Sequence, residues 1–120
     1  MNLRDRKNSS RNSLEKKLEE FVSEGRSKFY LFEIVEEANV SVLDAEDFFV
    51  PLLRGKKIEG KLEVRCPKCG AALGTYKRYP DVPEEITCEL CETEFPRSSN
   101  VLEIILEVKG EFFRAQEIRA

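Results

Sequence analysis

The chain has 120 residues, of which 41% are hydrophobic and 36% are charged, and its formal net charge is −3. A chain of this length forms one domain or two very small ones, and it buries only about two-thirds of the surface that it exposes when unfolded. It contains no histidine, the commonest general base in enzymes, and it has no glycine-rich phosphate loop or nucleophile motif. These absences make an enzyme the least supported class of function.

The N-terminal segment and the distribution of apolar residues predict where the chain resides. No apolar run approaches the ~20 residues of a membrane-spanning helix. Residues 1–12 lack the apolar centre of a signal peptide, and because they are polar and basic without periodicity we expect a disordered arm. We therefore expect a cytoplasmic protein, in a reducing environment, with no membrane partner.

A first amphipathic helix is expected between Ser13, a favourable N-cap residue, and the turn at Gly25. Leu14, Leu18 and Phe21 recur at helical spacing within it and form one apolar face. The aromatic residues of segment 28–31 then predict a short strand.

Two further helices are expected before residue 56. Residues 32–38 form the second, which ends at Asn39, a residue that tolerates the left-handed conformation. Ser41 begins a capping-box pattern for the third helix, and Gly55 closes it. Pro51 costs about 3 kcal/mol inside a helix because it lacks a backbone N–H. We therefore expect a kink at Pro51, or a last turn that starts afresh there.

The four cysteines form two C-x2-C pairs, Cys66 with Cys69 and Cys88 with Cys91. Two such pairs supply the four thiolates of a tetrahedral zinc site. The alternatives are two disulfides in a secreted domain or a rubredoxin-like iron site. A reducing compartment disfavours disulfides, and Glu92 disfavours iron because rubredoxin-like sites usually have glycine there. We predict one structural Zn²⁺ per chain, since four cysteine ligands leave no position open for water.

Strands are expected on either side of the first cysteine pair. Residues 58–64 alternate in polarity and predict a strand that leads into Cys66. Residues 75–79 and 85–87 are predicted as strands joined by a turn with two prolines. This arrangement is typical of a zinc ribbon.

The C-terminal segment is the most hydrophobic part of the chain. Within it, Leu102, Ile104, Leu106 and Val108 share one face of a predicted strand, and we expect that face to be buried. The strand needs a partner, and we expect residues 101–108 to pair with residues 58–65. A hairpin turn is expected at residues 109–110, with a return through residues 111–114.

Residues 54–78 contain eight basic and two acidic residues, whereas the chain on either side is acidic. One interpretation is that cations near the cysteines compensate the charge of four thiolates. The other is a surface for an anionic partner, most simply nucleic acid. The candidate partner-binding residues are Arg54, Lys56, Lys57, Lys61, Arg65, Lys68, Lys77 and Arg78.

These elements predict an α+β fold with an N-terminal winged-helix-like unit of three helices, a small sheet and a four-cysteine zinc ribbon. If the C-terminal strand pairs as expected, the ribbon is inserted where a winged helix has its wing. The expected parts are the arm 1–12, the winged-helix-like domain 13–65, the zinc ribbon 66–97 and the C-terminal strand or hairpin 98–120.

The helix-turn-helix segment 34–41, joined to a ribbon whose first cysteine pair lies in Cys66-Pro67-Lys68-Cys69-Gly70, resembles the family of archaeal transcription factor E and eukaryotic TFIIE-alpha. In that family the winged helix and the ribbon dock on RNA polymerase and assist promoter opening. The resemblance implies a transcription-associated function. The chain is shorter than typical members, and its long strand 101–108 is a departure from them.

The third helix separates two binding hypotheses. A winged helix that reads DNA places the N-terminal half of this helix in the major groove, but here that half contains Asp44, Glu46 and Asp47 and no cation. DNA repels these carboxylates. We therefore expect a small zinc-binding regulatory or transcription-associated adaptor for a protein partner, with weak, non-specific nucleic-acid contact through residues 54–78. The alternative is a winged-helix DNA-binding transcriptional regulator, and edge pairing of the C-terminal strand would make a homodimer.

Overall fold

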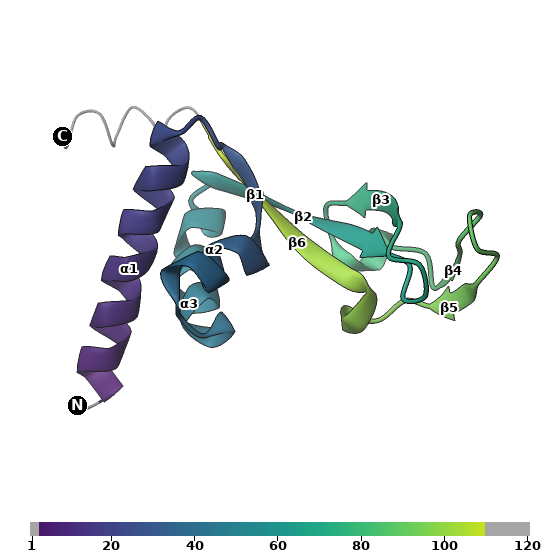
Figure 1. The fold of residues 1–120 in the computed structure, drawn as a ribbon, viewed down its shortest axis with the longest axis horizontal. Coiled ribbons are helices and arrows are strands. Elements are labelled where there is room, and N and C mark those ends of the chain that lie inside the picture. Colours follow the sequence, from purple (N-terminus) through teal and green to yellow (C-terminus); the bar gives the residue numbers. More distant parts are fainter. Residues whose placement is uncertain (1–2, 110–120) are drawn as a thin grey trace. The chain divides into compact units, whose positions relative to one another are not determined.

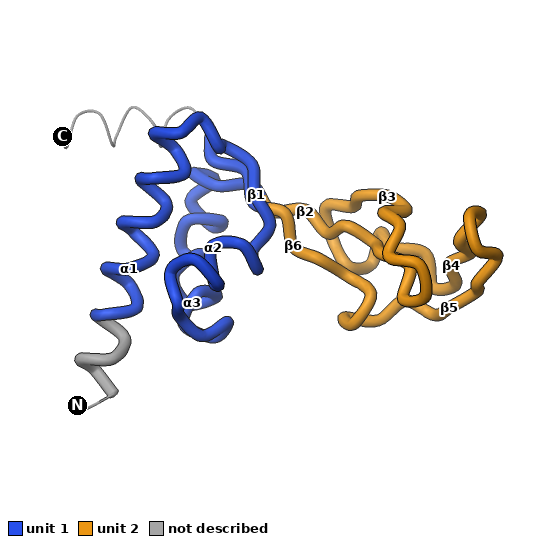
Figure 2. Tube along the Cα trace, in the orientation of Figure 1, with its two compact units in different colours: residues 1–59, 106–120 blue, residues 60–105 orange. Residues whose placement is uncertain are grey.

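The computed structural model describes residues 3–109, with side chains from residue 9 onward. Over this range the fold is α+β, with three α-helices and antiparallel strand pairs (Figure 1). The described chain divides into two compact units (Figure 2). Unit 1 contains the residues up to Glu59 and those from Leu106 onward, and unit 2 is Gly60–Ile105.

Helix α1, Leu3–Ser23, begins earlier than the Ser13 start that the sequence predicted. Most of the segment expected to be a disordered arm is therefore helical. The Ser10 hydroxyl donates a hydrogen bond to Asp44 Oδ2 at 2.8 Å, and Arg11 pairs with Glu15 one turn later at 3.4 Å. These contacts extend the helix past a favourable N-cap residue, because a tertiary contact outweighs a local preference.

The core of unit 1 forms between the apolar face of α1 and the two helices that follow, α2 (Leu31–Ala38) and α3 (Val42–Arg54). Leu14, Leu18 and Phe21 are buried, as their spacing predicted. Strand β1, Lys28–Tyr30, adds Phe29, whose ring lies 5.1 Å from that of Phe21 in an edge-on arrangement. Aromatic pairs of this geometry contribute about 1 kcal/mol beyond their buried area.

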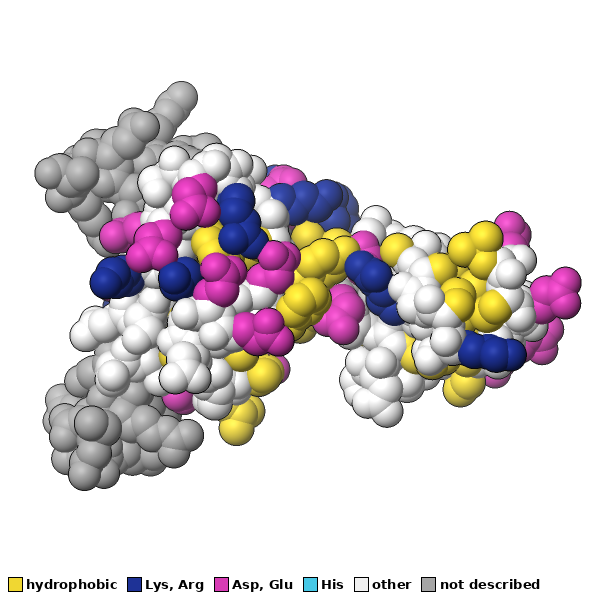
Figure 3. All heavy atoms as spheres, in the orientation of Figure 1, with side chains coloured by type: hydrophobic (Ala, Val, Ile, Leu, Met, Phe, Trp, Pro, Cys, Tyr) yellow, Lys and Arg dark blue, Asp and Glu magenta, His cyan; other side chains and the backbone are white. Residues whose placement is uncertain are grey.

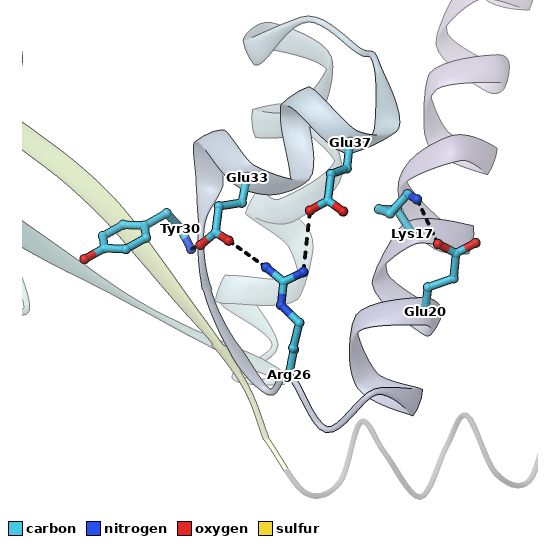
Figure 4. Close-up of polar contacts among 6 residues, drawn as sticks. All are labelled: Lys17, Glu20, Arg26, Tyr30, Glu33 and Glu37. Atoms are coloured by element: carbon cyan, nitrogen blue, oxygen red, sulfur yellow. Dashed lines mark hydrogen bonds and ion pairs between the residues drawn. The ribbon is translucent and has the colours of Figure 1, made fainter.

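Arg26 joins the turn after α1 to helix α2 (Figure 4). Its guanidinium donates a hydrogen bond to Glu33 at 2.6 Å and lies 3.5 Å from Glu37, and it stacks 3.9 Å from the centre of the Phe21 ring. Glu33 in turn accepts a hydrogen bond from the backbone N–H of Tyr30 at the start of α2. These contacts fix the angle at which the chain enters α2.

The ends of α2 and α3 match the sequence prediction. Asn39 adopts the left-handed conformation at the end of α2, with φ of 54°. Ser41 Oγ accepts the N–H of Asp44 at 3.1 Å and caps α3. The helix continues through Pro51, which is exposed and lies in the last turn, and the N–H of Gly55 donates to the Pro51 carbonyl at 3.0 Å.

A four-stranded sheet has the order β1-β6-β2-β3. Strand β2 is Ile58–Arg65, β3 is Ala72–Tyr76 and β6 is Leu102–Val108. Because β6 lies next to β2, the predicted pairing of residues 101–108 with residues 58–65 is confirmed. A second sheet pairs β4, Glu85–Thr87, with β5, Glu94–Pro96.

Strand β3 differs from the prediction, which placed it at residues 75–79. It pairs antiparallel with β2, Leu62 opposite Tyr76 and Arg65 opposite Ala72, so it begins soon after the first cysteine pair. Tyr79, predicted as the last residue of the strand, instead begins a 3-10 turn, Tyr79–Asp81, which overlaps the predicted turn. Pro80 favours this turn because its ring fixes φ and it has no N–H to donate to a neighbouring strand.

Strand β6 is buried on both faces near its C-terminal end. Leu106 and Val108 are buried, as predicted, and so is Ile105 on the opposite face, whereas Leu102 and Ile104 are only half-buried. The prediction of one continuous buried face is therefore wrong for half of the strand. Successive side chains of a strand point to opposite faces, so the burial of both Ile105 and Leu106 means that both faces of the strand are covered there. The hairpin predicted at residues 109–114 lies mostly outside the described residues.

The core of unit 2 is small and includes two of the four cysteines. Its buried members are Val64, Cys66, Val82, Cys88, Phe95 and Val101. A core of this size gives little hydrophobic stabilisation, and small units of this kind usually need a metal or a disulfide. Within the described part of the chain, no helix has both the length and the apolar character to span a membrane.

Candidate metal centre

The four cysteine sulfurs of unit 2 form one cluster. All four lie within 4.8 Å of one another, with 3.5 Å between the Sγ atoms of Cys66 and Cys91 and 3.6 Å between those of Cys69 and Cys88. Four sulfurs bound to zinc at about 2.3 Å lie about 3.8 Å apart at the corners of a tetrahedron. Disulfide sulfurs lie only about 2.05 Å apart, and all four cysteines are free. The cluster therefore fits a metal ion such as zinc.

Each cysteine pair lies in a five-residue loop, which we call a knuckle: residues 66–70 and residues 88–92. In each knuckle the backbone N–H of the fifth residue donates to the carbonyl of the first cysteine, Gly70 to Cys66 at 2.9 Å and Glu92 to Cys88 at 2.8 Å. Both fifth residues have positive φ, 77° at Gly70 and 61° at Glu92. Glu92 thus adopts the conformation that glycine takes in such a loop, and its presence no longer argues against iron.

A second pair of backbone bonds closes each knuckle against the chain that follows it. The N–H of Cys66 donates to the carbonyl of Ala71, and the N–H of Cys88 donates to the carbonyl of Thr93, both at 2.9 Å. Cys66 and Cys88 are buried, whereas Cys91 is half-buried and Cys69 is exposed. The first cysteine of each knuckle therefore anchors the cluster in the core of unit 2.

Hydrogen bonds to the sulfurs change their acidity. The hydroxyl of Thr93, 3.1 Å from Cys91 Sγ, together with the Thr93 backbone, lowers the pKa of Cys91 to about 6. The backbone N–H of Cys69 is the main cause of a lowered pKa at Cys66. At Cys69 the backbone of Ala71 lowers the pKa, but burial and the neighbouring thiols outweigh it and raise the pKa to about 11. Metals bind thiolates, so the lowered pKa values of Cys91 and Cys66 favour the form that binds a metal.

Arg65 lies beside this cluster in a structural position that the sequence did not indicate. Its Nε donates to Glu63 Oε1 at 2.7 Å, and its Nη1 donates to the carbonyl of Gly70 at 3.2 Å. Glu63 is only 8% exposed. Arg65 thus connects strand β2 to the first knuckle. This role could not be predicted from the sequence, because it depends on which carbonyl faces the guanidinium.

The eight predicted partner-binding cations are distributed over both units. Arg54, Lys56 and Lys57 belong to unit 1, and the remaining cations belong to unit 2: Lys61, Arg65, Lys68, Lys77 and Arg78. Lys61 and Arg65 are half-buried and the other six are exposed. Figure 3 shows basic side chains on both units, interspersed on unit 1 with acidic ones. Each unit therefore has its own group of exposed cations.

Comparison with protein-family models, with curated proteins and with solved structures gives no match to this chain. The class of protein is defined by the fold and the site alone. Over residues 3–109 it is an α+β protein with three α-helices, antiparallel strand pairs and a cluster of four cysteines able to hold a metal ion.

Proposed function

We propose that this chain is a zinc-binding adaptor of the winged-helix type, with a zinc ribbon inserted at the wing, that binds a protein partner in a transcription-associated or regulatory assembly. The order of elements supports the winged-helix assignment. Helix, strand, helix and helix are followed by β2 and, after an insertion, by β6, which lies between β1 and β2 in the sheet. This order is the one expected of a winged helix, and it supports the proposal that unit 2 is inserted in the chain at the position of the wing.

The donor set supports zinc in a structural role. Four thiolates at tetrahedral spacing are the usual ligands of structural zinc, and they leave no open position for water or substrate. One Zn²⁺ per chain would be held by Cys66, Cys69, Cys88 and Cys91. A metal that needs free thiolates also fits a reducing, cytoplasmic setting. Iron remains the alternative metal ion for the same four sulfur ligands.

The acidic first half of α3 is the observation that most supports a protein partner. Glu46 and Asp47 are exposed there, and Asp44 is engaged by Ser10. Phosphates repel exposed carboxylates, so this helix is a poor reader of the major groove. The exposed cations of each unit favour weak, salt-dependent nucleic-acid contact as a secondary property. A winged-helix DNA-binding regulator is the alternative function.

Affinity isolation of the full-length, metal-loaded protein from its own cells, with and without nuclease, tests this proposal. We expect the same set of proteins to accompany the chain in fixed proportion after nuclease treatment. A parallel titration uses labelled duplexes of different sequence, read by fluorescence anisotropy at several salt concentrations. Loss of every companion on nuclease treatment, together with tight binding that discriminates between duplexes, would overturn the adaptor proposal in favour of the DNA-binding regulator.

A further inference from the structure

The outward face of α3 combines exposed apolar and exposed acidic side chains. Leu43 is 73% exposed and Val50 is 38% exposed, and Glu46 and Asp47 are exposed between them. At about 100° per residue, these four positions fall within about one-third of the helix circumference. The buried residues Ala45 and Phe49 lie on the opposite side. Val42, 52% exposed in the first turn, lies beside this face in the same row as Phe49.

We call these four residues the α3 face: Leu43, Glu46, Asp47 and Val50. Large aliphatic side chains that stay exposed together on one helix face mark an interaction surface more often than scattered ones do. Two carboxylates at the centre of the face exclude an anionic partner such as DNA or RNA.

A second copy of this chain is also a poor fit. A symmetric dimer places the same surface of both copies together. The midpoint between Leu43 and Val50 falls at Glu46 and Asp47, so antiparallel pairing on the α3 face would bring four carboxylates together. Like charges at such close range destabilise the pairing. The occupant must therefore be apolar at its ends and basic at its centre.

We propose that the α3 face binds an α-helix of a partner protein in which a lysine or arginine lies between two apolar residues. Leu43 and Val50 are seven residues apart, which spans about 10.5 Å along the helix axis. A partner helix with apolar residues at the same spacing can place both against them, and a basic residue three or four positions after the first meets Glu46 and Asp47. This inference rests on the proposed adaptor function and specifies the surface that performs it.

The start of α3 is fixed before any partner arrives. Ser41 caps its first turn, and Ser10 of α1 donates to Asp44 on the side next to the face. Phe49 and Ala45 are buried beneath it. A surface that is already ordered loses little conformational entropy on binding, which favours affinity from a small contact area.

Two synthetic helical peptides test the inference. They share a scaffold with leucines seven residues apart and differ only at the position between them, lysine in one and glutamate in the other. Each is labelled and titrated by fluorescence anisotropy with the full-length, zinc-loaded chain. We expect saturable binding of the lysine peptide and about tenfold weaker binding of the glutamate peptide. Leu43→Ala should weaken binding of the lysine peptide about fivefold. It should leave the thermal midpoint of the protein unchanged, because Leu43 is exposed.

A charge swap provides the decisive comparison. In the double variant Glu46→Lys with Asp47→Lys, the preference should reverse, so that the glutamate peptide binds and the lysine peptide does not. The matched control is Glu19→Lys with Glu24→Lys, which changes net charge equally at exposed positions of α1 and the turn after it. This control should keep the wild-type preference. Reversal of preference cannot arise from a variant that merely fails to fold.

Three results would overturn the inference: no saturable binding of the lysine peptide, equal binding of both peptides, or equal loss of preference in the α1 control. The proposed function fails separately. If protein companions in the affinity isolation persist in Leu43→Ala and in the charge swap, the adaptor function stands and only the surface is wrong. If the companions depend on nucleic acid and a duplex binds with sequence discrimination, the adaptor function itself is wrong.

Discussion

Gly70 and Glu92 occupy equivalent positions in the two knuckles, with φ of 77° and 61°, and each donates its N–H to the first cysteine of its own loop. Only glycine adopts this conformation without a steric cost, which for other residues is about 1 kcal/mol. We expect Gly70→Ala to lower the free energy of unfolding by about 1 kcal/mol. A Cβ at residue 70 would meet no atom within 4 Å, so the loss is a backbone effect alone.

The reverse change, Glu92→Gly, should be neutral or should raise the free energy of unfolding by up to about 1 kcal/mol. Urea unfolding of the metal-loaded proteins measures both variants, with Glu89→Gly at an exposed site of the second knuckle as the control. A destabilised Glu92→Gly that matches the Glu89→Gly control would show that the two knuckles are not equivalent.

Thr93 should set metal affinity through its contact with Cys91. Its hydroxyl favours the thiolate of Cys91, whose pKa is lowered to about 6. Partners that hydrogen-bond a metal ligand typically change metal affinity by about 10-fold or more. We expect Thr93→Val to weaken zinc binding about 10-fold at pH 7 in competition with a chromophoric chelator. Thr75→Val, at an exposed position of β3, should leave the affinity unchanged, and equal affinities for both variants would contradict the assignment.

Arg65 should stabilise the fold and contribute little to partner binding. Arg65→Met keeps most of the side-chain volume and removes the bonds to Glu63 and Gly70. Because Arg65 is 39% exposed and water screens its charge, the loss should be about 1–2 kcal/mol. Lys77→Met removes an exposed cation of the same unit and should leave stability unchanged. Urea unfolding compares the stability of the two variants. If Arg65→Met leaves the free energy of unfolding unchanged but impairs nucleic-acid binding, Arg65 is a partner-binding residue after all.

Strand β6 should tolerate substitution unevenly. Leu106 is fully buried, so Leu106→Ala should cost about 3 kcal/mol in the free energy of unfolding. Ile104 is half-buried, and Ile104→Ala should cost about 1 kcal/mol. Thermal and urea unfolding of the two variants measure the difference. Equal losses would restore the single buried face that the alternating sequence suggested.

The features that the sequence predicted correctly depend on neighbours in the chain. Asn39 at the end of α2 and the Ser41 cap of α3 are local signals, and each is seen in the structure. The spacing within each cysteine pair is equally local, and it was enough to predict that the four sulfurs of Cys66, Cys69, Cys88 and Cys91 converge. The pairing of β6 with β2 was predictable because β2 was the available partner.

The features that the sequence missed depend on contacts between distant segments. The start of α1 is extended by Ser10 bonding to Asp44, thirty-four positions away. Both faces of β6 are buried at Ile105 and Leu106, although the alternation of the sequence indicated only one. The role of Arg65 depends on the position of the Gly70 carbonyl, which only the folded knuckle defines. Composition and periodicity carry no information about such contacts.

The metal content of the purified protein tests the central claim most directly. Native mass spectrometry of full-length protein, prepared without added metal or chelator, measures the identity and stoichiometry of the bound ion. We expect one zinc per chain, and we expect chelation to unfold unit 2, whose small core includes Cys66 and Cys88. Full occupancy by iron would contradict the zinc assignment. A metal-free chain with an unchanged thermal midpoint after chelation would contradict the metal centre itself.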